Sequence, residues 1–128
     1  MSVNFYLEKF QDDKVKDLIQ DLKNEEEIDD AEEMGIFAFG ETILITMAAG
    51  LITKLFVEVI SKTETWSKLI NLIHRIFKIG KKNSKSTKAR KLLAKINGEE
   101  LVLSSNDSEE EIEKKLQKIQ NWLQGISN

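Results

Sequence analysis

The chain of 128 residues contains no cysteine and no proline, and its one histidine is His74. The lack of cysteine excludes disulfides, thiolate metal sites and a cysteine nucleophile. A single histidine excludes any site that needs two imidazoles, such as the two-histidine zinc motif. The sequence also lacks the glycine-rich phosphate loop, the dinucleotide motif and the serine-hydrolase motif. We therefore expect no catalytic residue, no metal and no cofactor, and a protein that is not an enzyme.

What the chain does contain is typical of one folded domain covering residues 1–128. Hydrophobic residues make up 41% and charged residues 32% of the sequence, which allows a real core. Four segments are expected: a strand, helix and acidic segment (1–33), an apolar helical pair (34–79), a basic loop (80–88), and a hairpin with a closing helix (89–128).

The net charge of −3 hides a strong segregation of charge along the chain. Eight acids and one base lie between Asp21 and Glu33. Eight bases and no acid lie between Lys78 and Lys95. Such an asymmetry can steer binding partners, and the two segments can also face each other. No signal-peptide pattern begins the sequence, so we expect a cytoplasmic protein.

Both ends of the chain carry clear secondary-structure signals. Residues 2–10 alternate in polarity, which predicts a half-buried strand, and an amphipathic helix follows through about Asn24. Asn97-Gly98 is a preferred hairpin turn, flanked by predicted strands 89–96 and 99–104. Ser108 and Glu111 match a capping box, which predicts the start of the last helix.

The middle of the chain is its most apolar part. From about Gly40 to Ile60, apolar residues recur at helical spacing, which predicts a long helix with a broad apolar face. Ser61 and Glu64 match a second capping box, and the helix that follows is expected to end at Gly80. The predicted fold is α+β: about four helices pack on a three-stranded antiparallel sheet, formed by the N-terminal strand and the hairpin, in the order β-α-α-α-β-β-α.

The apolar helix is the first candidate functional surface. Its uncharged run, from Thr42 to Thr53, is twelve residues long and so too short for a membrane span. We interpret it as a face for self-association or a protein partner, with conditional insertion into an anionic membrane as the alternative. The residues of this face are Leu44, Ile45, Ala48, Leu51, Ile52, Leu55 and Val59.

The basic segment is the second candidate surface. Its members are Lys78, Lys81, Lys82, Lys85, Lys88, Arg90, Lys91 and Lys95. A basic loop before a hairpin can contact nucleic acid, anionic lipid or an acidic protein. Nucleic acid is the least expected of these partners, because the whole chain is acidic and no aromatic residue lies among the lysines.

From Met34 onward the sequence resembles a small bacterial family, the effector-associated constant component of NTP-dependent conflict systems. The resemblance rests on an apolar helix with small residues (Ala48, Ala49, Gly50), a helix bearing Trp66, the hairpin Ile96-Asn97-Gly98-Glu99 and a closing amphipathic helix. It implies a non-enzymatic adaptor that works beside sensor and effector proteins in bacterial antiviral defence. Two alternatives remain open: a membrane-perturbing effector that inserts the helices of 34–79, and a nucleic-acid-binding module that uses 78–95.

Overall fold

The computed structural model describes residues 3–37, 39–51, 53, 67–96 and 98–127, with the side chains of the last helix described up to Lys118. Five strands and three longer helices make up the fold. Their bounds are β1 (Val3–Glu8), α1 (Val15–Lys23), β2 (Ile28–Phe37), β3 (Gly40–Met47), α3 (Ser67–Lys82), β4 (Lys91–Ile96), β5 (Glu99–Ser104) and α4 (Glu109–Ser127). Residues 49–51 and 53 are also helical.

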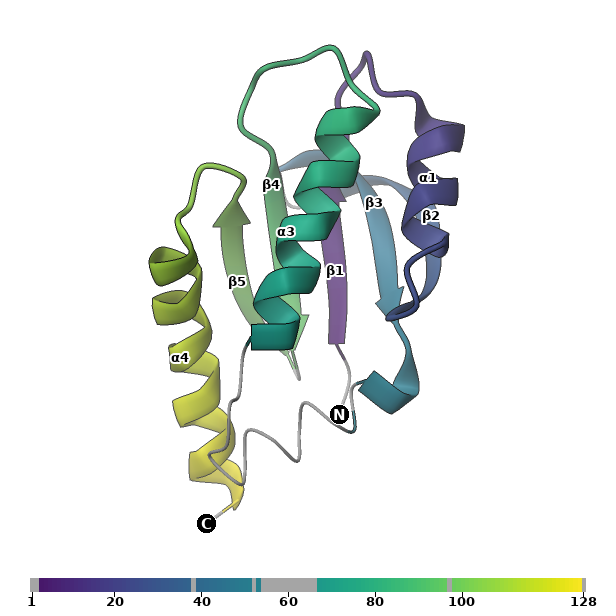
Figure 1. Ribbon diagram of the computed structural model, residues 1–128. Helices are drawn as coiled ribbons and strands as arrows, with labels where there is room; N and C mark the ends of the chain where they lie inside the picture. Colours follow the sequence, from purple (N-terminus) through teal and green to yellow (C-terminus); the bar gives the residue numbers. More distant parts are fainter. Residues whose placement is uncertain (1–2, 38, 52, 54–66, 97, 128) are drawn as a thin grey trace.

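The strands form one antiparallel sheet in the order β2-β3-β1-β4-β5. The central strand is β1, which pairs with β3 on one side and β4 on the other. The first part of the chain, from β1 through α1, β2, β3 and α3 to β4, follows the split β-α-β arrangement. Strand β5 and α4 extend it at the β4 edge. Figure 1 shows α1 and α3 in front of the sheet, with α4 beside β5.

The predicted three-stranded sheet is wrong, because residues 28–47 form a second hairpin, β2–β3. This hairpin takes the place of part of the expected acidic segment and of the first part of the expected apolar helix. Ile43, Ile45 and Met47 are buried at every second position, which is the spacing of a strand with one face on the core. The same segment is rich in threonine and isoleucine, which favour strands. The helical spacing of apolar residues was therefore a misleading signal for residues 40–47.

The core lies between the sheet and the helices. On β1, Val3, Phe5 and Leu7 face the helices, because alternate residues of a strand point to the same side. Helix α1 buries Leu18 and Leu22 at a spacing of four residues. Helix α3 contributes the largest buried stripe: Leu69, Leu72, Ile73, Ile76 and Phe77.

The predicted C-terminal elements are confirmed. Strands β4 and β5 pair with Ile96 opposite Glu99, and Gly98 between them has a positive φ of 88°. Asn97 lies outside the described residues, and β4 begins at Lys91 rather than at the predicted residue 89. At the start of α4, the Glu111 N–H donates to Ser108 Oγ (3.2 Å), and the Ser108 N–H donates to Glu111 Oε1 (3.3 Å). These two hydrogen bonds are the predicted capping box.

One predicted helix end is wrong. Gly80 lies inside α3, which continues to Lys82, rather than after its last turn. The predicted capping box at Ser61 and Glu64, and Trp66, lie outside the described residues.

In the part of the chain that the structure describes, none of the helices is both long enough and apolar enough to cross a membrane. The prediction that residues 34–79 form a helical pair is wrong for residues 34–37 and 40–47, since these belong to β2 and β3.

Candidate functional site

The residues of the predicted apolar face do not share one surface. Leu44 and Ile45 are neighbours on β3, so they point to opposite faces of the sheet. Ile45 is fully buried under the helices, whereas Leu44 is half-buried on the other face. Ala48 is half-buried, and Leu51 packs against the core. Three further members, Ile52, Leu55 and Val59, lie outside the described residues.

The predicted basic patch is also divided, and Arg90 does not belong to the surface at all. Its side chain is only 4% exposed, and the Asp13 side chain is 0% exposed. Arg90 Nη1 donates to Asp13 Oδ2 and Nη2 donates to Asp13 Oδ1, both at 2.8 Å. This is the bidentate geometry in which a guanidinium binds a carboxylate most strongly. Arg90 is therefore a structural residue of the core.

Three elements meet at Arg90. Nη1 also donates to the main-chain oxygen of Glu8 in β1 (2.8 Å), and Nη2 donates to that of Gly80 in α3 (3.2 Å). The guanidinium carbon lies 4.3 Å from the centre of the Phe10 ring, close enough for a cation–π contact. These contacts hold the start of β4 against the end of β1 and the last turns of α3.

Burial alone raises the pKa of Asp13, but hydrogen bonds from Arg90 and from the Phe10 N–H outweigh it and lower the pKa below its usual 3.8. Gly80 is needed for this packing. A Cβ at position 80 would lie 2.8 Å from Arg90 Nε, and the guanidinium could move away only by giving up hydrogen bonds to Asp13, Glu8 or Gly80.

The loop between α3 and β4 is tied down at its start. Asn83 is buried and donates from Nδ2 to Asp21 Oδ2 (2.9 Å) and to the Ile79 oxygen (3.0 Å). The Lys14 N–H donates to the Asn83 oxygen (2.8 Å). Further along, Ser84 Oγ accepts from the Ser86 N–H (3.1 Å). The start of the predicted basic loop is thus fixed against α1 and the residue that precedes it.

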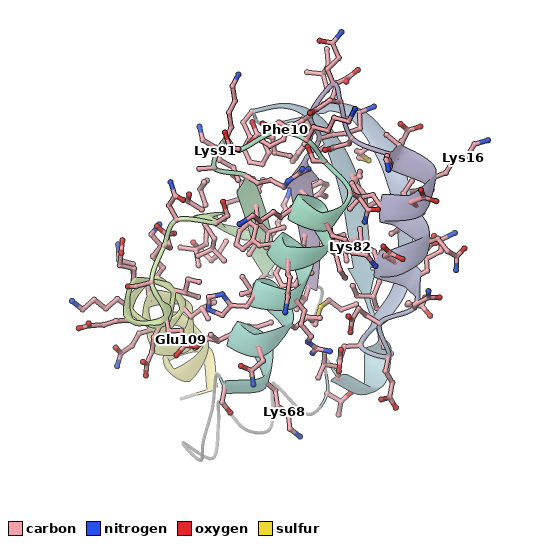
Figure 2. The ribbon with its side chains drawn as sticks, turned by 45° about the horizontal axis from the view of Figure 1, so that its top comes forward. Phe10, Lys16, Lys68, Lys82, Lys91 and Glu109 are labelled. Carbon is pink, nitrogen blue, oxygen red and sulfur yellow. The ribbon has the colours of Figure 1, made fainter. Side chains whose placement is uncertain are left out.

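The remaining bases point to four places. Lys82 faces α1, where its Nζ lies 3.6 Å from Asp21 Oδ2 (Figure 2). Lys91 and Lys95 lie on β4 at alternate positions that face away from the helices, and Lys85 is exposed on the loop. The last group lines a cavity of about 310 Å³ beside the C-terminal half of α3; its members are Lys78, Lys81 and Lys88.

The sheet face away from the helices has an ordered pattern that the sequence analysis missed. Strand register places Leu44, Tyr6, Leu93 and Val102 side by side across four strands. Tyr6 stacks on Phe37 with ring centres 4.4 Å apart, and both Tyr6 and Leu93 are buried. The rows on either side are polar. Within each strand the alternation of polar and apolar residues is visible in the sequence. Which residues lie side by side on neighbouring strands follows only from the strand register.

The edge strand β2 is the most exposed apolar element of the described chain. The largest exposed apolar side chains are Ile36 (86%), Val102 (47%) and Met34 (44%), and two of these three belong to β2. Four exposed acids lie on the same strand: Asp29, Asp30, Glu32 and Glu33.

Two of these acids have ion-pair partners. Lys9 Nζ lies 3.0 Å from Glu33, and this hydrogen bond raises the pKa of Lys9 above 10.5. Lys23 Nζ lies 3.6 Å from Asp30. Asp29 and Glu32 have no ion pair with any other residue that the structure describes. The sequence predicted an acidic segment here without a strand, and only its pairing with β3 makes it an edge.

The other charged clusters are small. Arg75 on α3 contacts Glu25 (2.6 Å) and Glu27 (3.0 Å), which fixes the turn between α1 and β2. His74 Nε2 lies 4.0 Å from Glu109 Oε1 at the start of α4. Within the described residues, no three carboxylate or imidazole groups are gathered in a way that could hold a metal ion.

Comparisons of the chain with protein-family models, with curated proteins and with solved structures find no match.

Proposed function

We propose that this protein is a non-enzymatic adaptor that binds a partner protein along the free edge of β2. The partner segment is an extended, basic stretch of chain that adds a strand to the sheet. The observation that carries the proposal is the edge itself: ten residues of strand end the sheet, and Met34 and Ile36 are exposed on it. Among the described residues, β2 has a neighbour on one side only, and an edge strand presents unpaired backbone groups that another strand can use. Its register shifts between Ile28 and Asp30 and between Glu33 and Gly35, so the longest regular stretch for pairing is residues 30–33.

The charge of β2 favours a basic partner over a second copy of the chain. If two β2 strands paired with each other, the four acids of one strand would lie next to those of the other, and like charges on paired strands repel. A segment that alternates lysine or arginine with apolar residues avoids this repulsion. It can pair with Asp29 and Glu32 and cover Met34 and Ile36.

The setting of this adaptor is the bacterial defence system that the resemblance from Met34 onward implies, in the cytoplasm. Support for the association role comes from the exposed β2 edge. This edge takes the place of the expected helical face from Leu44 to Val59 as the proposed contact surface. Of the features that carry the resemblance, the hairpin and the closing helix correspond to β4–β5 and α4, whereas residues 40–47 of the expected apolar helix form β3.

The test uses a decapeptide that alternates lysine and valine, titrated into the whole chain and followed by NMR and calorimetry. We expect amide shifts concentrated in residues 28–37. The double variant Asp29→Lys, Glu32→Lys should bind the peptide about tenfold more weakly, because it turns attraction into repulsion.

The matched control is Glu99→Lys, Glu100→Lys, which reverses two exposed acids on the opposite edge strand, β5. It changes the net charge by the same amount and should leave affinity within about twofold of the wild type. Equal losses in both double variants would show that the peptide binds by overall charge, and shifts confined to other strands would place it elsewhere. Either result contradicts the proposal.

A further inference from the structure

A cavity of about 310 Å³ lies at the end of the molecule where α3, the loop 83–90 and the β5–α4 turn come together. This volume is at the lower end of the range for small-molecule pockets. In Figure 2, Phe10, which lines this cavity, and Lys91 lie at the same end of the molecule, and Lys68 marks the opposite end of α3. The cavity is therefore remote from the start of α3.

The electrostatic character of this cavity is one-sided. Among the described residues, its lining includes three lysines, one arginine and one histidine, but no carboxylate. The arginine is Arg90, whose charge is already matched by Asp13. Lys78, Lys81 and Lys88 are exposed and form no ion pair with the described residues. Glu109 lies 4.0 Å from His74 at the margin of the cavity, but the three ammonium groups have no carboxylate partner among the described residues.

Two elements present these groups. His74, Lys78 and Lys81 lie at positions i, i+4 and i+7 of α3, which is one face of the helix. Lys88 reaches the cavity from the loop on the other side, next to the hydroxyls of Ser86 and Thr87. Cations from two sides of a cavity can surround an anion, whereas a run of lysines on one helix cannot.

The walls are built before any ligand arrives. Arg90 binds the Gly80 oxygen, and Asn83 binds the Ile79 oxygen, so these carbonyl groups near the C-terminal end of α3 are occupied. Their occupation reduces the repulsion that a helix C-terminus exerts on an anion. The Lys88 N–H donates to Ser86 Oγ (3.2 Å), which fixes the loop and leaves the hydroxyl proton free to donate.

From this geometry we propose that the cavity binds a phosphate-bearing small molecule of nucleotide size. The ammonium groups of Lys78, Lys81 and Lys88 hold the phosphate, and Ser86 and Thr87 donate hydrogen bonds to it. Charged donors to phosphate form strong, short hydrogen bonds. This site is independent of the β2 edge, because β3 and β1 lie between β2 and β4 in the sheet.

The test measures binding of ADP, inorganic phosphate and adenosine to the whole chain by calorimetry at low salt. We expect ADP to bind with one site per chain, phosphate to bind more weakly, and adenosine, which has no phosphate, not to bind. The variant Lys78→Gln, Lys88→Gln should lose at least about tenfold in ADP affinity.

The matched control is Lys85→Gln, Lys91→Gln, which removes two charges from the same basic segment but from outside the cavity. It should stay within about twofold of the wild type. All four substitutions are at exposed positions, and a melting curve of each variant checks that it folds. A third variant, Thr87→Glu, places a carboxylate at the cavity and should abolish ADP binding without removing a lysine.

Three results would overturn the proposal. The first is equal weakening of ADP binding by both double variants, since this indicates diffuse charge. The second is that adenosine binds with the same affinity as ADP. The third is that a single-stranded oligonucleotide binds at least tenfold more tightly than ADP and that both double variants weaken this binding. That result would assign the whole segment 78–95 to nucleic-acid binding.

Discussion

The acidic edge strand β2 and the basic segment 78–95 are both runs of like charge in the sequence, but the fold uses them in different ways. All four acids from Asp29 to Glu33 remain exposed on one strand. The bases separate: Arg90 is buried, Lys82 faces α1, and others line a cavity or the outer face of β4.

This difference shows that a run of charges in sequence is not a unit in space. Along an edge strand the charged side chains can stay solvated, and each ion pair contributes little to stability. Arg90 is different because it has left water, so it requires Asp13 and two backbone oxygens to compensate for its lost hydration. Substitutions in the two regions should therefore differ greatly in their effect on stability.

The largest effect is expected from Asp13→Ala. This change leaves the Arg90 guanidinium buried without its carboxylate, and we expect the free energy of unfolding to fall by about 3–5 kcal/mol. Urea denaturation measures the loss. The control is Asp17→Ala on the exposed side of α1, which should cost less than about 1 kcal/mol. Similar losses in the two variants would mean that the buried pair adds nothing to stability.

A smaller loss is expected from Gly80→Ala. The new methyl group would press on Arg90 Nε, and we expect a cost of about 1–3 kcal/mol despite the better helix propensity of alanine. Gly50→Ala is the matched change, because nothing lies within 4 Å of its added Cβ. It should be neutral or stabilising by up to about 1 kcal/mol in thermal melts. A neutral Gly80→Ala would show that Arg90 can move.

Acid should weaken the fold through carboxylates that are hydrogen-bonded in the native state. Burial alone raises the pKa of Asp107, but the Lys115 ammonium and the Ser104 N–H outweigh it and lower the pKa below 3.8. A carboxyl group whose pKa is lower in the folded than in the unfolded protein stabilises the fold at any pH above its unfolded-state pKa. This stabilisation is lost as the pH falls through the folded-state pKa. We therefore expect the free energy of unfolding to decline below about pH 4.

In the same titration, Asp107→Asn and Lys115→Gln should each make the decline shallower, since each removes the interaction that lowers this pKa. A slope unchanged in both variants would exclude Asp107 as a contributor to acid sensitivity.

The smallest effect is expected at the acidic edge. The double variant Asp29→Lys, Glu32→Lys changes two exposed residues without breaking an ion pair that the structure describes, so stability should stay within about 0.5 kcal/mol of the wild type. Its binding defect would then arise from the surface and not from unfolding. A loss above about 2 kcal/mol would instead mean that these acids are needed for the β2–β3 hairpin.

The sequence predicted those elements whose signals are local. Strand β1 alternates in polarity, Asn97-Gly98 marks the β4–β5 turn, and Ser108 with Glu111 caps α4. Each of these features depends on residues a few positions apart. The β2–β3 hairpin was missed because β2 has only Ile28 and Ala31 buried, and because a short run rich in isoleucine fits both a helix and a strand.

The candidate sites were harder to predict than the elements. The cavity combines Lys78 on α3 with Lys88 on the loop, and it depends on Arg90 turning inward to Asp13, 77 residues earlier in the chain. Composition revealed that bases gather between 78 and 95, but it gave no means to separate the buried guanidinium from the surface lysines.

The sequence by itself determined the α+β class, the amphipathic faces of α1 and α3, the β4–β5 hairpin and the cap of the last helix, because side-chain periodicity, turn residues and capping act over short distances. Only the tertiary structure decided that residues 28–47 complete a five-stranded sheet, that Arg90 enters the core, and that an acidic strand becomes an exposed edge. These outcomes depend on which distant segments supply hydrogen bonds and burial, and such long-range partners leave no mark at a single position in the chain.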